Sequence, residues 1–249
     1  MTLARYEVFR TVVETGGFLK AANELRMTQS AVSHAISSLE TEFGFPLLSR
    51  GRSGVQLTHN GEKVLSYIHQ ILNMNELLLQ EVAKIKGIKI GKVRIGTFPS
   101  VSINWLPKLI KEFRELYPHI EIKLFEGSYE AIKTWILDGV VDFGFLSSPI
   151  ASSFDFMEIK KDKLLCVLSQ HHPLSERKII TLDHLKKESL IVPKTHIDTD
   201  VRKILTENNL KSRIKYEMEE DQAIIAMVQH NLGISILPEL TLYRLPEGV

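Results

Sequence analysis

The chain has 249 residues, more than one average domain needs and enough for two. Its formal net charge of +1 neither favours nor excludes a nucleic-acid partner, while 44% hydrophobic residues suffice for a buried core. The sequence holds no run of eighteen apolar residues, no secretory signal and only one cysteine, Cys166. We therefore expect a cytoplasmic protein with no membrane span and no intrachain disulfide.

The first 58 residues are expected to form a small all-α winged helix-turn-helix domain. The expected elements are helices over 3–15, 18–25 and 28–40, and two short strands around Gly51–Gly54. Gly16 and Gly17 end the first helix, and Gly44 and Pro46 end the third. Three helices followed by a hairpin are typical of this domain.

A long linker helix is expected over 59–87, with Thr58 as its N-cap and Gly87 as its stop. Its apolar positions alternate at spacings of four and three, which is the pattern of a heptad seam. The seam comprises Val64, Ile68, Ile71, Asn75, Leu78, Val82 and Ile85. Among these, dimer contacts are assigned to Ile68, Ile71, Asn75, Leu78 and Val82. The alternative is one amphipathic helix packed on its own domain.

Residues 88–249 alternate strand and helix patterns and predict two small α/β lobes with parallel sheets. The expected strands are 92–98, 120–125, 141–146, 164–169, 190–193, 214–219 and 233–238. The expected helices run from Ser102 to Tyr117, from about Ser128 to Asp138, and over 182–188, 198–208 and 221–231. Ligands in such folds bind beyond the carboxyl ends of the strands.

The helix over 28–40 has two different faces. Val32, Ala35, Ile36 and Leu39 form an apolar stripe for the core. The other face carries no acidic residue, so it can approach a major groove without repelling phosphates, and Gln can bind adenine at two points. A wing would bring its arginines to the DNA backbone or minor groove. The candidate DNA-binding residues are Gln29, Ser30, Ser33, His34, Ser37, Arg50 and Arg52.

The placement of these residues carries the DNA-binding hypothesis, because their charge does not. Residues 1–65 hold seven Lys and Arg against six Glu, which is not a basic block. A serine-rich helix face alone is more often just a solvated face. The joint occurrence of the serine face, a preceding helix and a following wing favours DNA binding.

The stretch ETGGFLKAANELRMTQSAVSHAISSLETEFGFPLLSRGRSGVQLTHNGEKVL resembles the N-terminal domain of LysR-type transcriptional regulators. The matching positions are Ala21, Ala22, Leu25, Gln29 to Ser33, Leu39, Glu40, Gly44, Arg50, Leu57, Thr58 and Gly61. One departure is Leu48, where phenylalanine is usual. The resemblance extends over nearly the whole chain, because a long helix and two α/β lobes are also the family's architecture.

The resemblance implies a two-lobe Rossmann-like effector domain, similar to periplasmic binding proteins, that binds a small inducer between its lobes. It also implies a homodimer or homotetramer that binds dyad-symmetric duplex DNA and recruits RNA polymerase. From the residues themselves, we expect no catalytic residue, metal or cofactor. By position, the inducer would contact Thr97, Pro99, Ser100, Ser128, Ser147 and Thr195. Hydroxyls and helix amides suit a carboxylate or another anion, although these residues could equally serve only as helix caps.

The family's pattern continues past Val249 with a further strand, so we expect an effector domain that either is truncated at its C-terminus or lacks the closing pieces of its first lobe. Two other classes of function have features in common with this sequence or its expected fold. A solute-binding protein shares the two-lobe fold, but the DNA-binding type of N-terminus and the lack of a signal peptide count against it. An enzyme lacks support, because no P-loop, G-x-G-x-x-G or G-x-S-x-G motif is present. His196, Asp198 and Asp200 could hold a cation, but a loop leading into a helix cap is the favoured interpretation.

Overall fold

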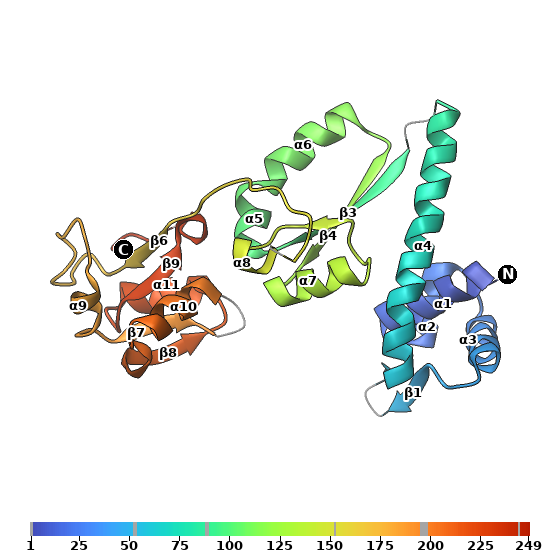
Figure 1. Cartoon of the computed structure of the whole chain (residues 1–249), viewed down its shortest axis with the longest axis horizontal. Coiled ribbons are helices and arrows are strands. Elements are labelled where there is room, and N and C mark those ends of the chain that lie inside the picture. Colours follow the sequence, from blue (N-terminus) through green and yellow to red (C-terminus); the bar gives the residue numbers. More distant parts are fainter. Residues whose placement is uncertain (1, 52–53, 88–89, 152, 195–198, 244) are drawn as a thin grey trace. The chain divides into compact units, whose positions relative to one another are not determined.

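The computed structural model describes residues 2–51, 54–87, 90–151, 153–194, 199–243 and 245–249 (Figure 1). Its internal contacts form two compact units. The first comprises Met1–Gly96, Phe113–Phe125 and Lys133–Gly144, and the second comprises Thr97–Glu112, Glu126–Ile132 and Phe145–Val249. The first unit therefore combines the N-terminal helices with strands of the first α/β lobe.

The N-terminal region is a winged helix-turn-helix, as predicted. It contains α1 (Thr2–Thr15), α2 (Phe18–Leu25), α3 (Gln29–Phe43) and an antiparallel hairpin of β1 (Leu48–Gly51) and β2 (Gly54–Leu57). Each helix contributes apolar side chains to one core, which includes Phe9, Val12, Ala22, Ile36 and Leu39. Burial of these faces holds the three short helices together, since helices of this length are marginal alone.

The long helix α4 (His59–Ile85) begins where the hairpin ends. The Thr58 hydroxyl accepts the Gly61 N–H at 3.0 Å and donates to the Pro46 carbonyl at 2.8 Å, so it caps the helix and anchors it to the hairpin. A Cβ at Gly61 would lie 2.1 Å from the Leu47 carbonyl oxygen. Only glycine therefore lets α4 start this close to the hairpin.

The predicted heptad seam divides into two parts. Val64 and Ile68 pack into the core of the N-terminal domain, where Ile68 is only 2% exposed. The prediction that Ile68 contacts a second copy was therefore wrong, because the protein's own core covers this side chain. Ile71, Leu78 and Val82 are exposed, and Asn75 is half-buried.

Three strands form the sheet of the first lobe, in the order β4-β3-β5. They are β3 (Gly91–Thr97), β4 (Ile120–Glu126) and β5 (Phe143–Gly144), with β3 and β5 parallel. The third strand is much shorter than the predicted 141–146. The accompanying helices are α5 (Pro99–Asn104), α6 (Leu106–Leu116), α7 (Tyr129–Leu137) and α8 (Ser148–Ala151).

The single helix expected from Ser102 to Tyr117 is instead two helices. The first begins at Pro99. Proline is favoured at the first helical position, because the N–H that it lacks would have no acceptor within the helix. Pro107 then lies in the first turn of α6, where it cannot donate to the carbonyl four residues earlier, so the two helices separate at Trp105. The Ser102 hydroxyl lies 3.2 Å from the Thr97 hydroxyl and caps no helix start.

The second lobe contains two-stranded sheets and covering helices. Its elements are β6 (Leu164–Val167), α9 (Leu182–Leu185), β7 (Leu190–Pro193), α10 (Thr199–Glu207), β8 (Ile214–Met218), α11 (Asp221–Gln229) and β9 (Ser235–Pro238), with short 3-10 turns at Lys211–Arg213 and Glu239–Thr241. β7 and β8 are parallel, and Leu190, Ile191 and Val192 are fully buried, as expected for a strand covered on both faces.

The expectation of parallel pairing fails for β6, which is antiparallel to β9. The chain runs from β6 to β9 through α9, β7, α10, β8 and α11. The relative direction of the two strands therefore depends on how the chain returns through the whole second lobe, and no single helical crossover between them requires parallel pairing. The α/β class with an N-terminal winged helix domain and a long helix is confirmed.

Candidate DNA interface and effector site

The helix α3 is fixed at both ends and along one face. The Thr28 side chain accepts the Ala31 N–H at 3.2 Å, and Gly44, with a φ of 78°, closes the C-terminus. Val32, Ile36 and Leu39 are buried in the domain core. Because these residues lie on one face, the opposite face must point to solvent.

That outer face carries the predicted reading residues. Gln29, Ser30, His34 and Ser37 are exposed and Ser33 is half-buried. The Ser30 hydroxyl lies 3.0 Å from the Thr28 hydroxyl, which places both at the amide-rich N-terminus of the helix. Hydroxyls, an amide and an imidazole with no carboxylate among them can donate to base edges and phosphates.

The same helix also positions the wing. A single carboxylate oxygen of Glu40 accepts the N–H of Leu47 at 2.7 Å and that of Leu48 at 3.1 Å. Charge-assisted hydrogen bonds of this kind are among the stronger ones in proteins, so they hold the hairpin to α3. Arg50 belongs to β1, but its side chain lies outside the described part of the structure, and Arg52 lies wholly outside it.

The structure adds Arg5 to this surface, which the sequence analysis missed. Its guanidinium pairs with Glu42 at 2.7 Å, bringing the start of α1 beside the end of α3. A hollow of about 460 Å³ there is lined by Arg5, His34, Ser37, Ser38, Thr41 and Glu42. Thr41 could have been found, because it follows Ser37 by four residues. No sequence signal places Arg5 there, since that depends on how α1 packs on α3.

The predicted effector residues of the first lobe gather at the ends of β3 and β4. The Gly127 N–H donates to the Thr97 carbonyl at 3.0 Å, so the two strands end side by side. Thr97 is fully buried and Ser100 is 6% exposed, whereas Pro99 is exposed. The Ser128 hydroxyl accepts the Ala131 N–H at 3.3 Å, which is the helix-cap role left open above.

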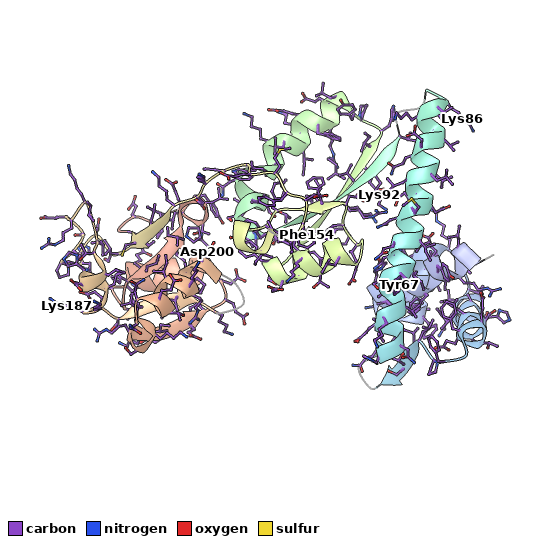
Figure 2. All side chains as sticks on the ribbon, in the orientation of Figure 1. Tyr67, Lys86, Lys92, Phe154, Lys187 and Asp200 are labelled. Carbon is purple, nitrogen blue, oxygen red and sulfur yellow. The ribbon has the colours of Figure 1, made fainter. Side chains whose placement is uncertain are left out.

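Ser147 has an acidic neighbour. Its hydroxyl donates to the carboxylate of Asp200 at 2.8 Å, and Asp200 is among the side chains drawn in Figure 2. A carboxylate at this point opposes an anionic group on the same hydroxyl. Thr195, the residue expected from the second lobe, lies outside the described residues, as do His196 and Asp198.

Cys166 has the environment of an unreactive thiol. Burial, followed by the negative charge of Glu188, raises the pKa of Cys166 to about 11. The thiol is therefore protonated at neutral pH, whereas a cysteine nucleophile needs its thiolate. Within the described ranges, no three or more His, Cys, Asp or Glu side chains form a group that could hold a metal ion. No helix in those ranges is long and apolar enough to cross a membrane.

A winged helix-turn-helix with an exposed polar helix face, joined by a long helix to two α/β lobes, is the architecture of a DNA-binding regulator with a ligand-binding module. Residues 3–62 match the family model described as bacterial regulatory helix-turn-helix protein, lysR family, and residues 87–248 match the LysR substrate binding domain. The chain belongs to the LysR family of DNA-binding transcriptional regulators, and its C-terminal part is their effector-binding domain.

Known proteins of this family are similar over the whole chain. An uncharacterized HTH-type transcriptional regulator of Bacillus subtilis, YvbU, is 35% identical over 99% of this chain and 84% of its own length. The HTH-type transcriptional activator CmpR of Synechocystis is 33% identical over 100% of this chain and 82% of its own length. A full-length OxyR variant from Pseudomonas aeruginosa, at 21% identity, shares the fold with a TM-score of 0.73 over 99% of this chain and 82% of that one.

Proposed function

We propose that this regulator reads dyad-symmetric promoter DNA through the outer face of α3, and that a small ligand at the strand ends of the effector domain controls it. The observation that carries the proposal is the reading face itself. Gln29, Ser30, His34 and Ser37 are exposed on one side of a helix whose other side is buried. Such a face can contact base edges while the wing and Arg5 contact the backbone.

We further propose that the regulator works as a homodimer or homotetramer, through α4. Dyad symmetry in the DNA matches two-fold symmetry in the protein. From Tyr67 towards its C-terminal end, α4 exposes an apolar stripe at helical spacing, made of Tyr67, Ile71, Met74, Leu78, Val82 and Ile85. Figure 2 shows Tyr67 on this helix. An exposed apolar stripe of this length on one helix suits a second helix of the same kind.

We propose that the ligand is a small anion, such as a carboxylate. We propose no metal and no organic cofactor. The amides around the ends of β3 and β4, near Ser100 and Ser128, are its expected partners. The pairing of Ser147 with Asp200 argues against Ser147 as an anion contact. We propose RNA polymerase as a further partner. We also propose that the regulator lies in the cytoplasm, the compartment that holds its DNA, and we propose no catalytic function.

Footprinting on the DNA upstream of the protein's own gene tests this proposal. We expect Gln29→Ala or Ser33→Ala to weaken binding to the footprinted duplex by about 10-fold to 100-fold, while binding to random duplex changes little, because base contacts alone discriminate sequences. Ser66→Ala, which removes a hydroxyl from α4, is the matched control and should leave both affinities unchanged. Equal losses on both duplexes would remove the assignment of base reading to these residues.

A further inference from the structure

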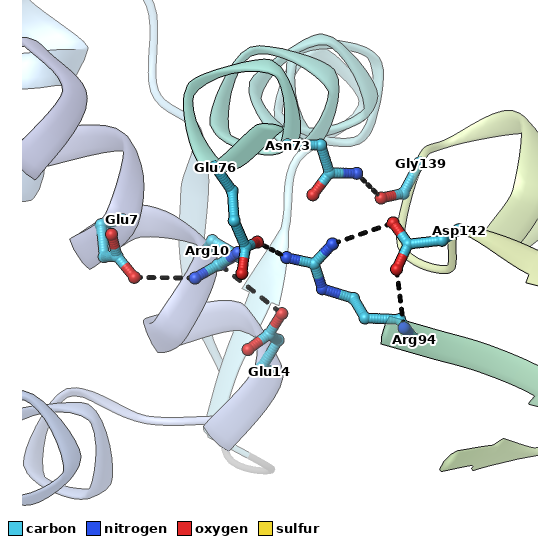
Figure 3. A network of polar contacts seen from close by, with 8 residues as sticks. All are labelled: Glu7, Arg10, Glu14, Asn73, Glu76, Arg94, Gly139 and Asp142. Atoms are coloured by element: carbon cyan, nitrogen blue, oxygen red, sulfur yellow. Dashed lines mark hydrogen bonds and ion pairs between the residues drawn. The ribbon is translucent and has the colours of Figure 1, made fainter. Parts of the chain in front are cut away.

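Arg94 is a buried charged residue. It belongs neither to the outer face of α3, nor to the exposed apolar stripe of α4, nor to the predicted effector residues. It lies in β3, and its side chain is only 8% exposed. The guanidinium forms an ion pair with Glu76 of α4 and contacts the Asp142 carboxylate at 3.3 Å (Figure 3). The other oxygen of Asp142 accepts the backbone N–H of Arg94 at 2.6 Å. The arginine therefore joins the long helix to the chain that enters β5.

A turn of the first lobe fits against the same part of α4. Asn73 donates through its amide to the Gly139 carbonyl, and Gln70 donates to the Leu137 carbonyl at 3.5 Å. A Cβ at Gly139 would lie 3.0 Å from the Asn73 amide nitrogen, and the φ of 68° at Gly139 also disfavours any side chain. Glycine is thus needed for this close fit.

The three contacting side chains of α4 share one face. Gln70, Asn73 and Glu76 follow each other at intervals of three residues, which keeps them on one side of a helix. The exposed apolar stripe, which includes Leu78, lies on a different side, so the turn leaves that stripe open. Docking of the turn and pairing of two copies can therefore coexist on α4.

The charges of this contact extend to α1. Arg10 pairs with Glu7 at 2.7 Å and lies 3.8 Å from Glu14. Burial raises the pKa of Glu14, while Arg10 and, more weakly, Lys123 and Lys92 lower it. Basic side chains of β3 and β4 thus act electrostatically on an acidic side chain of the DNA-binding domain.

We propose that Arg94 is a positioning residue that docks turn 137–142 on the polar face of α4 and so couples the effector domain to the DNA-reading helices. Removal of Arg94 would leave the carboxylates of Glu76 and Asp142 without their shared cation, and removal of Glu76 would leave the buried arginine with Asp142 alone. A shift of β3 or of the turn must therefore move α4 with it or break the pair. The coupling to the DNA-reading helices rests on the proposed function, whereas the docking of turn 137–142 on α4 does not.

Hydrogen exchange of the full chain tests the docking without DNA or ligand. We expect Arg94→Gln and Glu76→Gln each to speed exchange by about tenfold both in turn 137–142 and in α4 around 70–76. The double variant should exchange no faster than Arg94→Gln alone, because Arg94→Gln already removes the contact that Glu76→Gln breaks. Glu76 is 30% exposed, so Glu76→Gln keeps the fold even where a buried glutamine at Arg94 does not.

The control is a second ion pair on the same helix, Glu81 with Lys84 at 3.3 Å, which is exposed. Glu81→Gln and Lys84→Gln should leave exchange within about twofold of the wild type. Unchanged exchange in α4 after Arg94→Gln, or multiplicative effects in the double variant, would overturn the docking.

The coupling is tested by adding the footprinted duplex. We expect the duplex to slow exchange in α3 and also to change it severalfold in turn 137–142, and we expect Arg94→Gln to abolish only the change in the turn. If the duplex leaves exchange in turn 137–142 unchanged in both the wild type and Arg94→Gln, the coupling is refuted. A duplex that does not protect α3 refutes the proposed DNA contact instead, and the exchange without DNA still decides the docking.

Discussion

His69 lies on the inner side of α4 with 7% of its surface exposed. Neither ring nitrogen has a hydrogen-bond partner in the described part of the chain. Burial, followed by the positive charges of Arg10 and Arg94, lowers the pKa of His69 from 6.5 to about 4. The folded protein therefore holds a neutral imidazole next to two arginines.

We expect this histidine to make folding sensitive to acid. Its folded pKa lies below its unfolded pKa, so the full stability is present above about pH 6.5 and is lost as the pH falls towards 4. The loss should reach about 2 kcal/mol at pH 5. Urea unfolding at pH 7 and pH 5 measures it. His69→Gln should reduce the difference in the free energy of unfolding between the two pH values by that amount, while exposed His119→Gln should not. Identical pH dependence in His69→Gln and the wild type would contradict the assignment.

The candidate site was predictable residue by residue only where one helix presents it. The outer face of α3 follows from the helical period, because its apolar partners Val32, Ile36 and Leu39 define the inner face. Arg5 was missed because it reaches the site from another helix. Thr97 was expected to face a ligand, yet its side chain is fully buried. Strand ends show where a site can lie, but packing decides which side chains are exposed there.

At the scale of elements, the joint between the wing and α4 is the most tightly packed place that the glycines reveal. Gly61 lies against the Leu47 carbonyl, and Thr58 joins both segments. We expect Gly61→Ala to destabilise the protein by about 2 kcal/mol, because backbone must move to admit a methyl group. Thermal or urea unfolding measures the loss.

Gly91→Ala is the control for this prediction. A Cβ there would meet only the Gln80 side chain at 3.6 Å, which is ordinary contact, so the change should stay within about 0.5 kcal/mol of the wild type. Equal stabilities of Gly61→Ala and Gly91→Ala would mean that α4 can move away from the hairpin at no cost.

Elements with strong local signals were predicted best. The cap at Thr58 and the stops at Gly16 and Gly44 set helix ends within a few residues. Prediction failed where a distant partner decides. The antiparallel pairing of β6 with β9 depends on how the chain returns from the end of the second lobe, and β5 ends after two residues although its sequence continues the strand pattern.

For the whole molecule, the exposed stripe on α4 predicts association. We expect Leu78→Glu to shift the protein towards monomer, because a charge in a helix–helix seam costs desolvation without a partner. Leu77→Glu is the matched control, since Leu77 is 53% exposed and Leu78 is 61% exposed, but Leu77 lies outside the stripe. Sedimentation velocity at several concentrations measures both. Identical association of the two variants would remove the stripe from the interface.

The sequence by itself determined the winged helix domain, the long helix and the alternation of strands and helices, because each follows from local periodicity and end signals. It also determined the exposed polar face of α3, because the residues of that face all lie on one helix. Only the tertiary structure decided that Ile68 belongs to the protein's own core, that Arg5 lies beside the end of α3, and that Arg94 pairs with Glu76. Those contacts join residues far apart in the chain, and their energy depends on which faces pack together, a choice that no local pattern encodes.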